Sequence, residues 1–175
     1  MEEYKLFLNK TPGDGKFDRA HAILLTHDGR VLLRYKNGEP RITGGHIDLD
    51  DVSLEMALRR ELLEEINCEI DRCDYLGYVK IKIDGGRTEE NWARMVARVA
   101  KIGEPKADSD RENNWVYGRT LAPREIAMEE LSKVEVFGKN NAKLLDAAYK
   151  VAREQEYFTE LPSTEYEVLN FESHD

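Results

Sequence analysis

Three glutamates stand close together in the stretch "RRELLEE" at residues 59–65. Glu61, Glu64 and Glu65 are spaced i, i+3 and i+4, so a helix would place their carboxylates on one side. Like charges at these spacings repel, and each pair costs a helix about 0.2–0.5 kcal/mol. A divalent cation removes that repulsion, and Mg²⁺ in particular binds carboxylates together with waters and phosphates. A solvated acidic helix face is the alternative, and the spacing alone leaves both interpretations open.

The helix that would carry these glutamates has clear ends in the sequence. Ser53 precedes a periodic apolar pattern and is a favourable N-cap, so the helix is predicted to run to about Ile66. Asn67 tolerates the left-handed conformation in which many helices end. Leu58 and Leu62 share the apolar face with Ile66, and the three carboxylates flank that face. Carboxylates crowded at the margin of a buried face are costly unless a cation joins them, but the helix geometry alone leaves the metal site and the solvated acidic face equally open.

Strand-like segments surround this helix. Two apolar runs around a central glycine turn predict a hairpin at residues 20–35. Segments rich in β-branched and aromatic residues predict further strands at 73–84, 91–102 and 114–118, with a polar loop at 104–113. These strands and the central helix predict an α+β fold.

Two helices are predicted near the end of the chain. Pro123 is a plausible opener for the first, and residues 140–156 have the apolar periodicity of an amphipathic helix. Residues 1–155 are therefore predicted to form a single domain. Residues 156–175 mix aromatic and acidic side chains, and we interpret them as a peripheral tail that packs on the domain or meets a partner, such as a second copy in a homodimer.

The composition excludes several classes of function. The chain has 175 residues and a net charge of −9, so it has no basic surplus for binding a nucleic-acid polymer or an anionic membrane surface. It contains no apolar run of the roughly 18–20 residues that a membrane span needs, and its N-terminus lacks the features of a secretory signal. Two cysteines are too few for a structural zinc site. These features predict a cytoplasmic protein that handles small molecules.

The central stretch resembles the Nudix (MutT-like) hydrolase family. That family's signature is a glycine, five residues, a glutamate, seven residues, and then Arg-Glu-apolar-any-Glu-Glu-any-Gly-apolar. Residues 60–66 match the second half of the signature in register, and Gly44 and Gly45 stand where its loop should begin. The resemblance covers about residues 17–155. It implies the Nudix fold, in which a mixed β-sheet is packed between helices as an α/β/α sandwich.

The loop before the helix departs from the family signature. Counting back from Arg60, the family's glycine falls on His46 and its glutamate on Val52, so the loop carries one extra residue. Asp51 or Asp48 is expected to supply the missing acid. Asn67 replaces the family's final glycine, which its conformational range permits.

The resemblance implies a hydrolase that depends on Mg²⁺ or Mn²⁺ and cleaves the diphosphate bond of a nucleoside diphosphate linked to another moiety. By the same resemblance, Glu64 and Glu65 are expected to be metal ligands, and Glu61 a further ligand or the general base. Arg60 is expected to orient these carboxylates through charge-assisted hydrogen bonds. The carbonyl of Gly44 is expected to complete the coordination shell.

Three further residues are candidates for this site. Gly45 and His46 are candidate substrate-binding residues, because a glycine lets the backbone approach phosphates closely. Glu112, like Asp51, is a candidate loop acid, since in this family a second acid often comes from a loop after the motif. A plain solvated acid is the alternative interpretation of Glu112.

Two main classes of function stay open. The first is an active Nudix hydrolase. The second is a Nudix-fold module that binds or senses nucleotides with weak or no turnover, and Val52 at the glutamate position favours it. A prenyl diphosphate isomerase shares the fold, but Cys68 is poorly placed for the catalytic cysteine that such an enzyme needs. The sequence names neither the nucleotide substrate nor the oligomeric state.

Overall fold

A mixed β-sheet runs through the computed structural model, which describes residues 3–134 and 137–175. Within these residues the sheet has nine strands, in the order β1-β6-β7-β2-β3-β8-β9, with β4 paired to β3 and β5 paired to β2. The strands are β1 (Glu3–Leu8), β2 (Arg19–Leu25), β3 (Val31–Lys36), β4 (Glu39–Arg41), β5 (Thr43–His46), β6 (Cys68–Ile83), β7 (Thr88–Ile102), β8 (Gly118–Ala122) and β9 (Glu167–Asn170).

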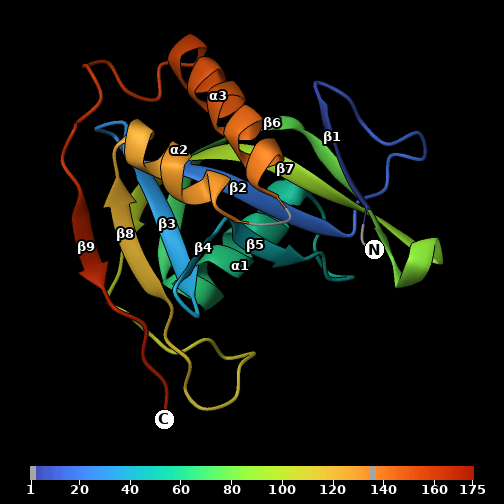
Figure 1. Ribbon diagram of the computed structural model, residues 1–175, viewed down its shortest axis with the longest axis horizontal. Coiled ribbons are helices and arrows are strands. Elements are labelled where there is room, and N and C mark those ends of the chain that lie inside the picture. The colour runs from blue at the N-terminus through green and yellow to red at the C-terminus, as the bar shows by residue number, and fades with distance from the viewer. Residues whose placement is uncertain (1–2, 135–136) are drawn as a thin grey trace.

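Helices cover both faces of the sheet (Figure 1). One face packs against α1 (Leu54–Ile66), and the other packs against α2 (Arg124–Ser132) and α3 (Gly138–Glu154). A short 3-10 turn (Asp84–Gly86) joins β6 to β7. Each face has its own cluster of buried apolar side chains, one built around α1 and the other around α3. The predicted α+β sandwich is therefore confirmed.

The central helix begins and ends as the sequence predicts. The side chain of Ser53 accepts a hydrogen bond from the backbone N–H of Met56 at 3.1 Å, which is the N-cap arrangement. Asn67 ends the helix with φ 49° and ψ 54°, the left-handed conformation expected of it. Leu58 and Leu62 are fully buried against the sheet. These contacts fix the rotation of α1 and hence the direction of its glutamates.

The sheet opens between β2 and β3. The two strands pair at one position only, Leu25 with Val31. Beyond it, β2 pairs with β5 and β3 pairs with β4, so β4 and β5 take the edges that the diverging strands expose. On its other side β2 lies parallel to β7, in a register that pairs His21 with Arg94. Side chains from both faces of the sheet can therefore meet at the opening.

The strand predicted at 114–118 was wrong in position. The regular strand is β8, which starts at Gly118, the residue paired with Tyr35 of β3. Val116 forms only an isolated bridge with Ser173. The Tyr117 hydroxyl donates to Asp108 at 2.8 Å, so this aromatic stretch anchors the preceding loop instead of joining the ladder.

Residues 156–175 pack on the domain, which is the first of the two alternatives for this segment. Residues 167–170 form β9 and pair with β8 at the edge of the sheet. The carboxylate of Glu172 accepts hydrogen bonds from the backbone N–H groups of Asn37 and Gly38, both at 2.7 Å. None of the helices in the described parts of the chain has the length and apolar character needed to cross a bilayer.

Candidate active site

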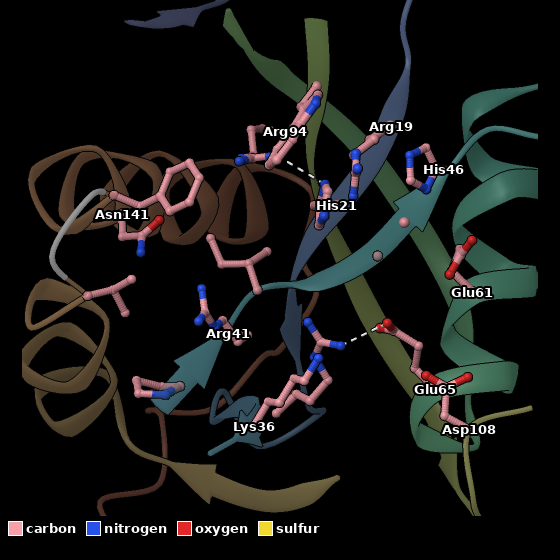
Figure 2. Close-up of a pocket in the computed structure, with 18 of the residues that line it drawn as sticks. Arg19, His21, Lys36, Arg41, His46, Glu61, Glu65, Arg94, Asp108 and Asn141 are labelled. Carbon is pink, nitrogen blue, oxygen red and sulfur yellow. Dashed lines mark hydrogen bonds and ion pairs between the residues drawn. The ribbon is translucent and has the colours of Figure 1, made fainter. Parts of the chain in front are cut away.

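A cavity of about 600 Å³ lies beside α1 at the opening of the sheet (Figure 2). Cationic side chains outnumber acidic ones in its lining, although the whole chain is acidic. Four carboxylates line it, from Glu61, Glu65, Asp108 and Asp110. Six cationic side chains also line it, from Arg19, Arg34, Lys36, Arg41, Arg94 and Arg111. Such a cavity suits a ligand with several negative charges.

Glu61 and Glu65 form the acidic end of the cavity. Both residues are only 8% exposed, whereas Glu64 is half-buried and does not line the cavity. Glu65 Oε1 accepts a hydrogen bond from Arg34 at 2.8 Å, but its buried Oε2 has no partner in the described structure. Burial raises the pKa of Glu65 to about 7 despite the attraction of Arg34, and burial also raises the pKa of Glu61. Carboxylates in this state gain most from a bound cation.

Arg60 connects α1 to the loop that precedes it. Its Nη1 donates to Glu61 at 3.0 Å and to Glu64 at 3.2 Å. Its Nη2 donates to the backbone carbonyl of His46 at 2.9 Å and to Asp51 at 2.8 Å. The planar guanidinium thus holds two of the motif glutamates and the end of β5 in one network, an arrangement that its rigid fork favours.

Asp51 is the better placed of the two acids considered for the altered loop. Its carboxylate lies 2.8 Å from Arg60 Nη2 and its side chain is 6% exposed. Asp48 lies 3.4 Å from the same nitrogen and its side chain is 58% exposed. Asp51 also accepts a hydrogen bond from the backbone N–H of Asp48, which closes the loop. Val52, at the position of the family's glutamate, points into solvent.

This ion pair leads to a prediction about stability and pH. Hydrogen bonding to Arg60 lowers the pKa of Asp51 below its ordinary value of 3.8. Because the folded pKa is the lower one, the stabilisation is present above the unfolded pKa and is lost as the pH falls through the folded pKa. We expect Asp51→Asn to reduce the free energy of unfolding by about 1–2 kcal/mol near pH 7. In urea unfolding experiments, the difference in free energy of unfolding between Asp51→Asn and the wild type should shrink below about pH 4.

Asp48→Asn is the matched control for this experiment. Its exposed side chain should change the free energy of unfolding by less than about 0.5 kcal/mol at either pH. If Asp48→Asn had the larger, pH-dependent effect, Asp48 rather than Asp51 would be the partner of Arg60 in solution.

The glycine pair on β5 brings bare backbone to the acidic end of the cavity. Gly44 has φ +148°, and a Cβ there would lie 2.0 Å from the carbonyl oxygen of Ala20. A Cβ on Gly45 would lie 2.3 Å from a carboxylate oxygen of Glu61. His46 follows on β5 and also lines the cavity. The absence of side chains on two successive residues leaves the Glu61 carboxylate in direct contact with the strand.

The loop between β7 and β8 contributes acids other than the one expected. Glu112 is exposed and does not line the cavity. Asp108 and Asp110, from the same loop, do line it. Asp108 is held in place by the Tyr117 hydroxyl at 2.8 Å and accepts the backbone N–H of Asp110 at 3.0 Å. The loop turns tightly at Asp108, so it presents residues 108 and 110 to the cavity and residue 112 to solvent.

The acidic end has the chemistry of a site for a hard divalent cation. Glu65 Oε2 is a buried oxygen without a partner in the described structure, and Glu61, Gly44 and Gly45 line the same cavity. Oxygen donors of this kind suit Mg²⁺ or Mn²⁺. Within residues 3–134 and 137–175, no three acidic, histidine or cysteine side chains converge on one point. Glu65 and Glu61 turn instead towards Arg34 and Arg60.

Comparison with known proteins identifies the family. The NUDIX domain profile matches residues 16–148 of the chain. The chain belongs to the Nudix family. A search of curated protein sequences found no match.

Three solved structures show how widely this Nudix fold is shared. A mutant form of the Bacillus subtilis pyrophosphohydrolase BsRppH has a TM-score of 0.62 and 18% identity, covering 87% of this chain and 90% of its own. A MutT structure from work on Aliivibrio salmonicida and Vibrio cholerae has a TM-score of 0.52 and 14% identity, covering 74% and 96%. An ADP compounds hydrolase has a TM-score of 0.56 and 18% identity, covering 79% and 75%. At these identities the likeness concerns the fold.

The basic side of the Nudix cavity was missed by the sequence analysis. Arg34 comes from β3, while Arg19 and Arg94 come from β2 and β7, far apart in the chain. The available signal was the segment "NWARMVARV", in which Arg94 interrupts an apolar strand. A charged residue at an inward position of a buried strand indicates either a buried ion pair or a ligand.

Proposed function

We propose that this protein is a divalent-metal-dependent hydrolase that cleaves the diphosphate bond of a nucleoside diphosphate linked to another moiety. The observation that carries the proposal is the cavity itself, which is lined by two buried carboxylates of α1 and by six cationic side chains. Family membership supports the reaction class, and the names of two structural neighbours, a pyrophosphohydrolase and an ADP compounds hydrolase, agree with it.

The charge distribution supports a polyanionic substrate. Four of the six cationic side chains have a carboxylate within 4 Å, so the cavity keeps a positive surplus near Lys36 and Arg94. Phosphate oxygens bind well to arginine and lysine, and a low-dielectric cavity strengthens that attraction. A substrate with two or more phosphates would neutralise this surplus.

Each residue at the acidic end has a defined role in the proposal. Glu65 and Glu64 would hold the metal with the carbonyl of Gly44, and Glu61 would be a further ligand or accept the proton of the attacking water. When bound, the cation supplies charge neutralisation and a more acidic water. Arg60 positions the carboxylates, and Gly45 with His46 would contact the phosphates. Water adds to one phosphorus while the bond to the bridging oxygen breaks, giving two phosphate products.

A substrate panel tests this function. We expect the purified protein to release a mononucleotide or phosphate from at least one nucleoside triphosphate, nucleotide sugar, dinucleotide or coenzyme when Mg²⁺ or Mn²⁺ is present. Removing the metal with EDTA should abolish turnover, and adding the metal back should restore it. Product formation is measured by chromatography and phosphate release.

The alternative is a Nudix module that binds nucleotides without turnover, and the non-glutamate Val52 favours it. No turnover across the panel, together with calorimetric nucleotide binding, would support that alternative. A prenyl isomerase is disfavoured because Cys68 is 1% exposed and burial raises its pKa to about 12. A cytoplasmic location and a homodimer stay predictions.

A further inference from the structure

Arg94 is a buried arginine with few partners. The residue is 4% exposed and lies on β7 beside the cavity, close to His21 and Arg19 (Figure 2). Its Nη1 donates to Nδ1 of His21 at 3.2 Å and to the carbonyl of Ala93 at 3.5 Å. In the described part of the chain, Nε and Nη2 make no hydrogen bond and no carboxylate lies within 4 Å. Two contacts, one at the distance limit, leave most of the five N–H donors unused.

Arg119 shows what a structural buried arginine looks like in this same protein. It is 3% exposed and also lacks a carboxylate partner in the described residues. Its guanidinium donates to Asn170 Oδ1 at 2.6 Å and to the carbonyls of Ile66 and Gly103, both at 2.9 Å. Arg119 thus connects three segments through good acceptors. Arg94 reaches beyond its own strand through one hydrogen bond, to His21 of β2, so it contributes far less to the fold than Arg119 does.

The surroundings of Arg94 favour an anion. Burial and the nearby arginines lower the pKa of His21 well below its usual range, and an imidazole carries no negative charge in either protonation state, so His21 does not neutralise Arg94. Arg19 lies with its guanidinium 4.6 Å from the centre of the Trp92 ring, and its buried Nε has no hydrogen bond in the described structure. Glu90, 3.6 Å from Arg19 Nε, is the nearby acid. Among the described residues, Glu90 is therefore a counter-charge for Arg19, whereas no carboxylate lies within 4 Å of Arg94.

Arg94 and Arg19 form a basic pair that lies away from the acidic end of the cavity. In the sheet, Gly44 of β5 pairs with His21 of β2, which pairs with Arg94 of β7. Neighbouring strands are about 4.8 Å apart, so the Arg94 backbone lies about 10 Å from that of Gly44. Figure 2 shows Arg94, Arg19 and His21 grouped apart from Glu61 and Glu65 on α1. A diphosphate held at α1 would leave Arg94 to another part of the substrate.

We propose that Arg94, assisted by Arg19, binds a second phosphoryl group of the substrate, separate from the diphosphate that is cleaved. This inference rests on the proposed function and narrows its substrate class to nucleotides with an additional phosphate. That phosphate would sit on a ribose hydroxyl or at the end of a longer phosphate chain. Trp92 and Phe137, with ring centres 6.1 Å apart, form the apolar wall beside it.

Calorimetry with pairs of nucleotides that differ by one phosphate tests the inference without requiring turnover. AMP is compared with adenosine 2′,5′-bisphosphate and adenosine 3′,5′-bisphosphate for the ribose position, and ADP with ATP for the chain. In at least one pair, we expect the wild type to bind the nucleotide with the extra phosphate about tenfold more tightly than the nucleotide without it. A tenfold difference in Kd corresponds to about one charge-assisted hydrogen bond. Arg94→Met should lose that preference and bind the nucleotide without the extra phosphate as before.

Arg98 provides the matched control. It lies on the same strand, points to the same face, and is paired with Asp71 outside the cavity. Arg98→Met should keep the phosphate preference. Arg94→Lys, which retains a positive charge, should restore part of the preference that Arg94→Met loses.

Thermal unfolding separates binding from a structural role. Arg94→Met removes a buried charge that has no carboxylate partner among the described residues, so its melting temperature should equal or exceed that of the wild type. The inference would be overturned if Arg94→Met lowered the melting temperature and weakened the binding of all the nucleotides equally. It would also be overturned if the wild type bound both nucleotides of every pair with the same affinity. A protein that keeps the preference but hydrolyses nothing would defeat the proposed activity and leave the phosphate site standing.

Discussion

Replacing Glu65 with glutamine is expected to reduce kcat/KM for any diphosphate substrate by at least about 100-fold, because losing even an outer-shell partner of a metal site costs about 10–100-fold. Glutamine has the same shape and can still accept the 2.8 Å hydrogen bond from Arg34, so the protein should stay folded. The change replaces one carboxylate oxygen with an amide nitrogen that cannot bind a cation. Steady-state kinetics across a range of Mg²⁺ and Mn²⁺ concentrations measure the loss.

Two further variants make this result interpretable. Glu64→Gln should lower kcat/KM by at least about tenfold, as expected for a ligand at the exposed side of the site. Glu55→Gln is the control, because Glu55 lies on the same helix and pairs with Arg59 at 2.7 Å outside the cavity. Its activity should stay within about twofold of the wild type, as for a surface ion pair. Full activity in both Glu64→Gln and Glu65→Gln would show that the assigned roles are wrong.

The second large effect is expected from Arg60→Met, which should impair both stability and activity. The arginine contacts Asp51, Glu61, Glu64 and a backbone carbonyl, so its loss leaves partly buried carboxylates without a counter-charge. Its side chain is 26% exposed, so we expect a loss of about 2 kcal/mol, below the range for a fully buried pair. In a chain of this size that lowers the melting temperature by roughly 4–8 °C.

Activity should fall by at least about 100-fold in Arg60→Met, because misplaced carboxylates lose the geometry that the reaction needs. Arg59→Met is the matched control: the neighbouring arginine pairs with Glu55 and does not line the cavity. It should cost about 1 kcal/mol or less and leave kcat/KM unchanged. The losses of stability and activity in Arg60→Lys should lie between those of Arg59→Met and Arg60→Met, since lysine keeps the positive charge but lacks the planar guanidinium that binds several acceptors at once. Equal losses in Arg59→Met and Arg60→Met would refute the special role of Arg60.

The acidic end of the site could be predicted from the sequence because its signals are local. Ser53 and Asn67 bound α1 through interactions within a few residues, and the spacing of the glutamates then follows from helix geometry. The family signature placed Gly44 and Gly45 at the same site as the glutamates, and the structure adds the close approach of Gly45 to Glu61. The contacts of these residues are observed, whereas their roles in metal binding stay predictions.

The basic end could not be predicted in the same way. Arg94, Arg19 and Arg34 meet because β7, β2 and β3 are neighbours in the sheet, and strand order is a non-local property. The same reason explains why β1 and β9 were missed, since each is defined by pairing with a distant strand. Glu112 was named from the sequence, and Asp108 and Asp110 were not considered, because the turn that directs them into the cavity depends on the contact between Asp108 and Tyr117. Loop direction of this kind follows from tertiary contacts.

The opening between β2 and β3 has a consequence for how such a protein can change. The reacting group would be held from the α1 face and the remainder of the ligand from the α3 face, and each face rests on its own apolar cluster. Substitutions around Arg94 therefore need not disturb the packing of Leu58 and Leu62, and free-energy effects at such separated positions generally add. Selection or design can retune recognition on one side while the chemistry on the other is inherited intact.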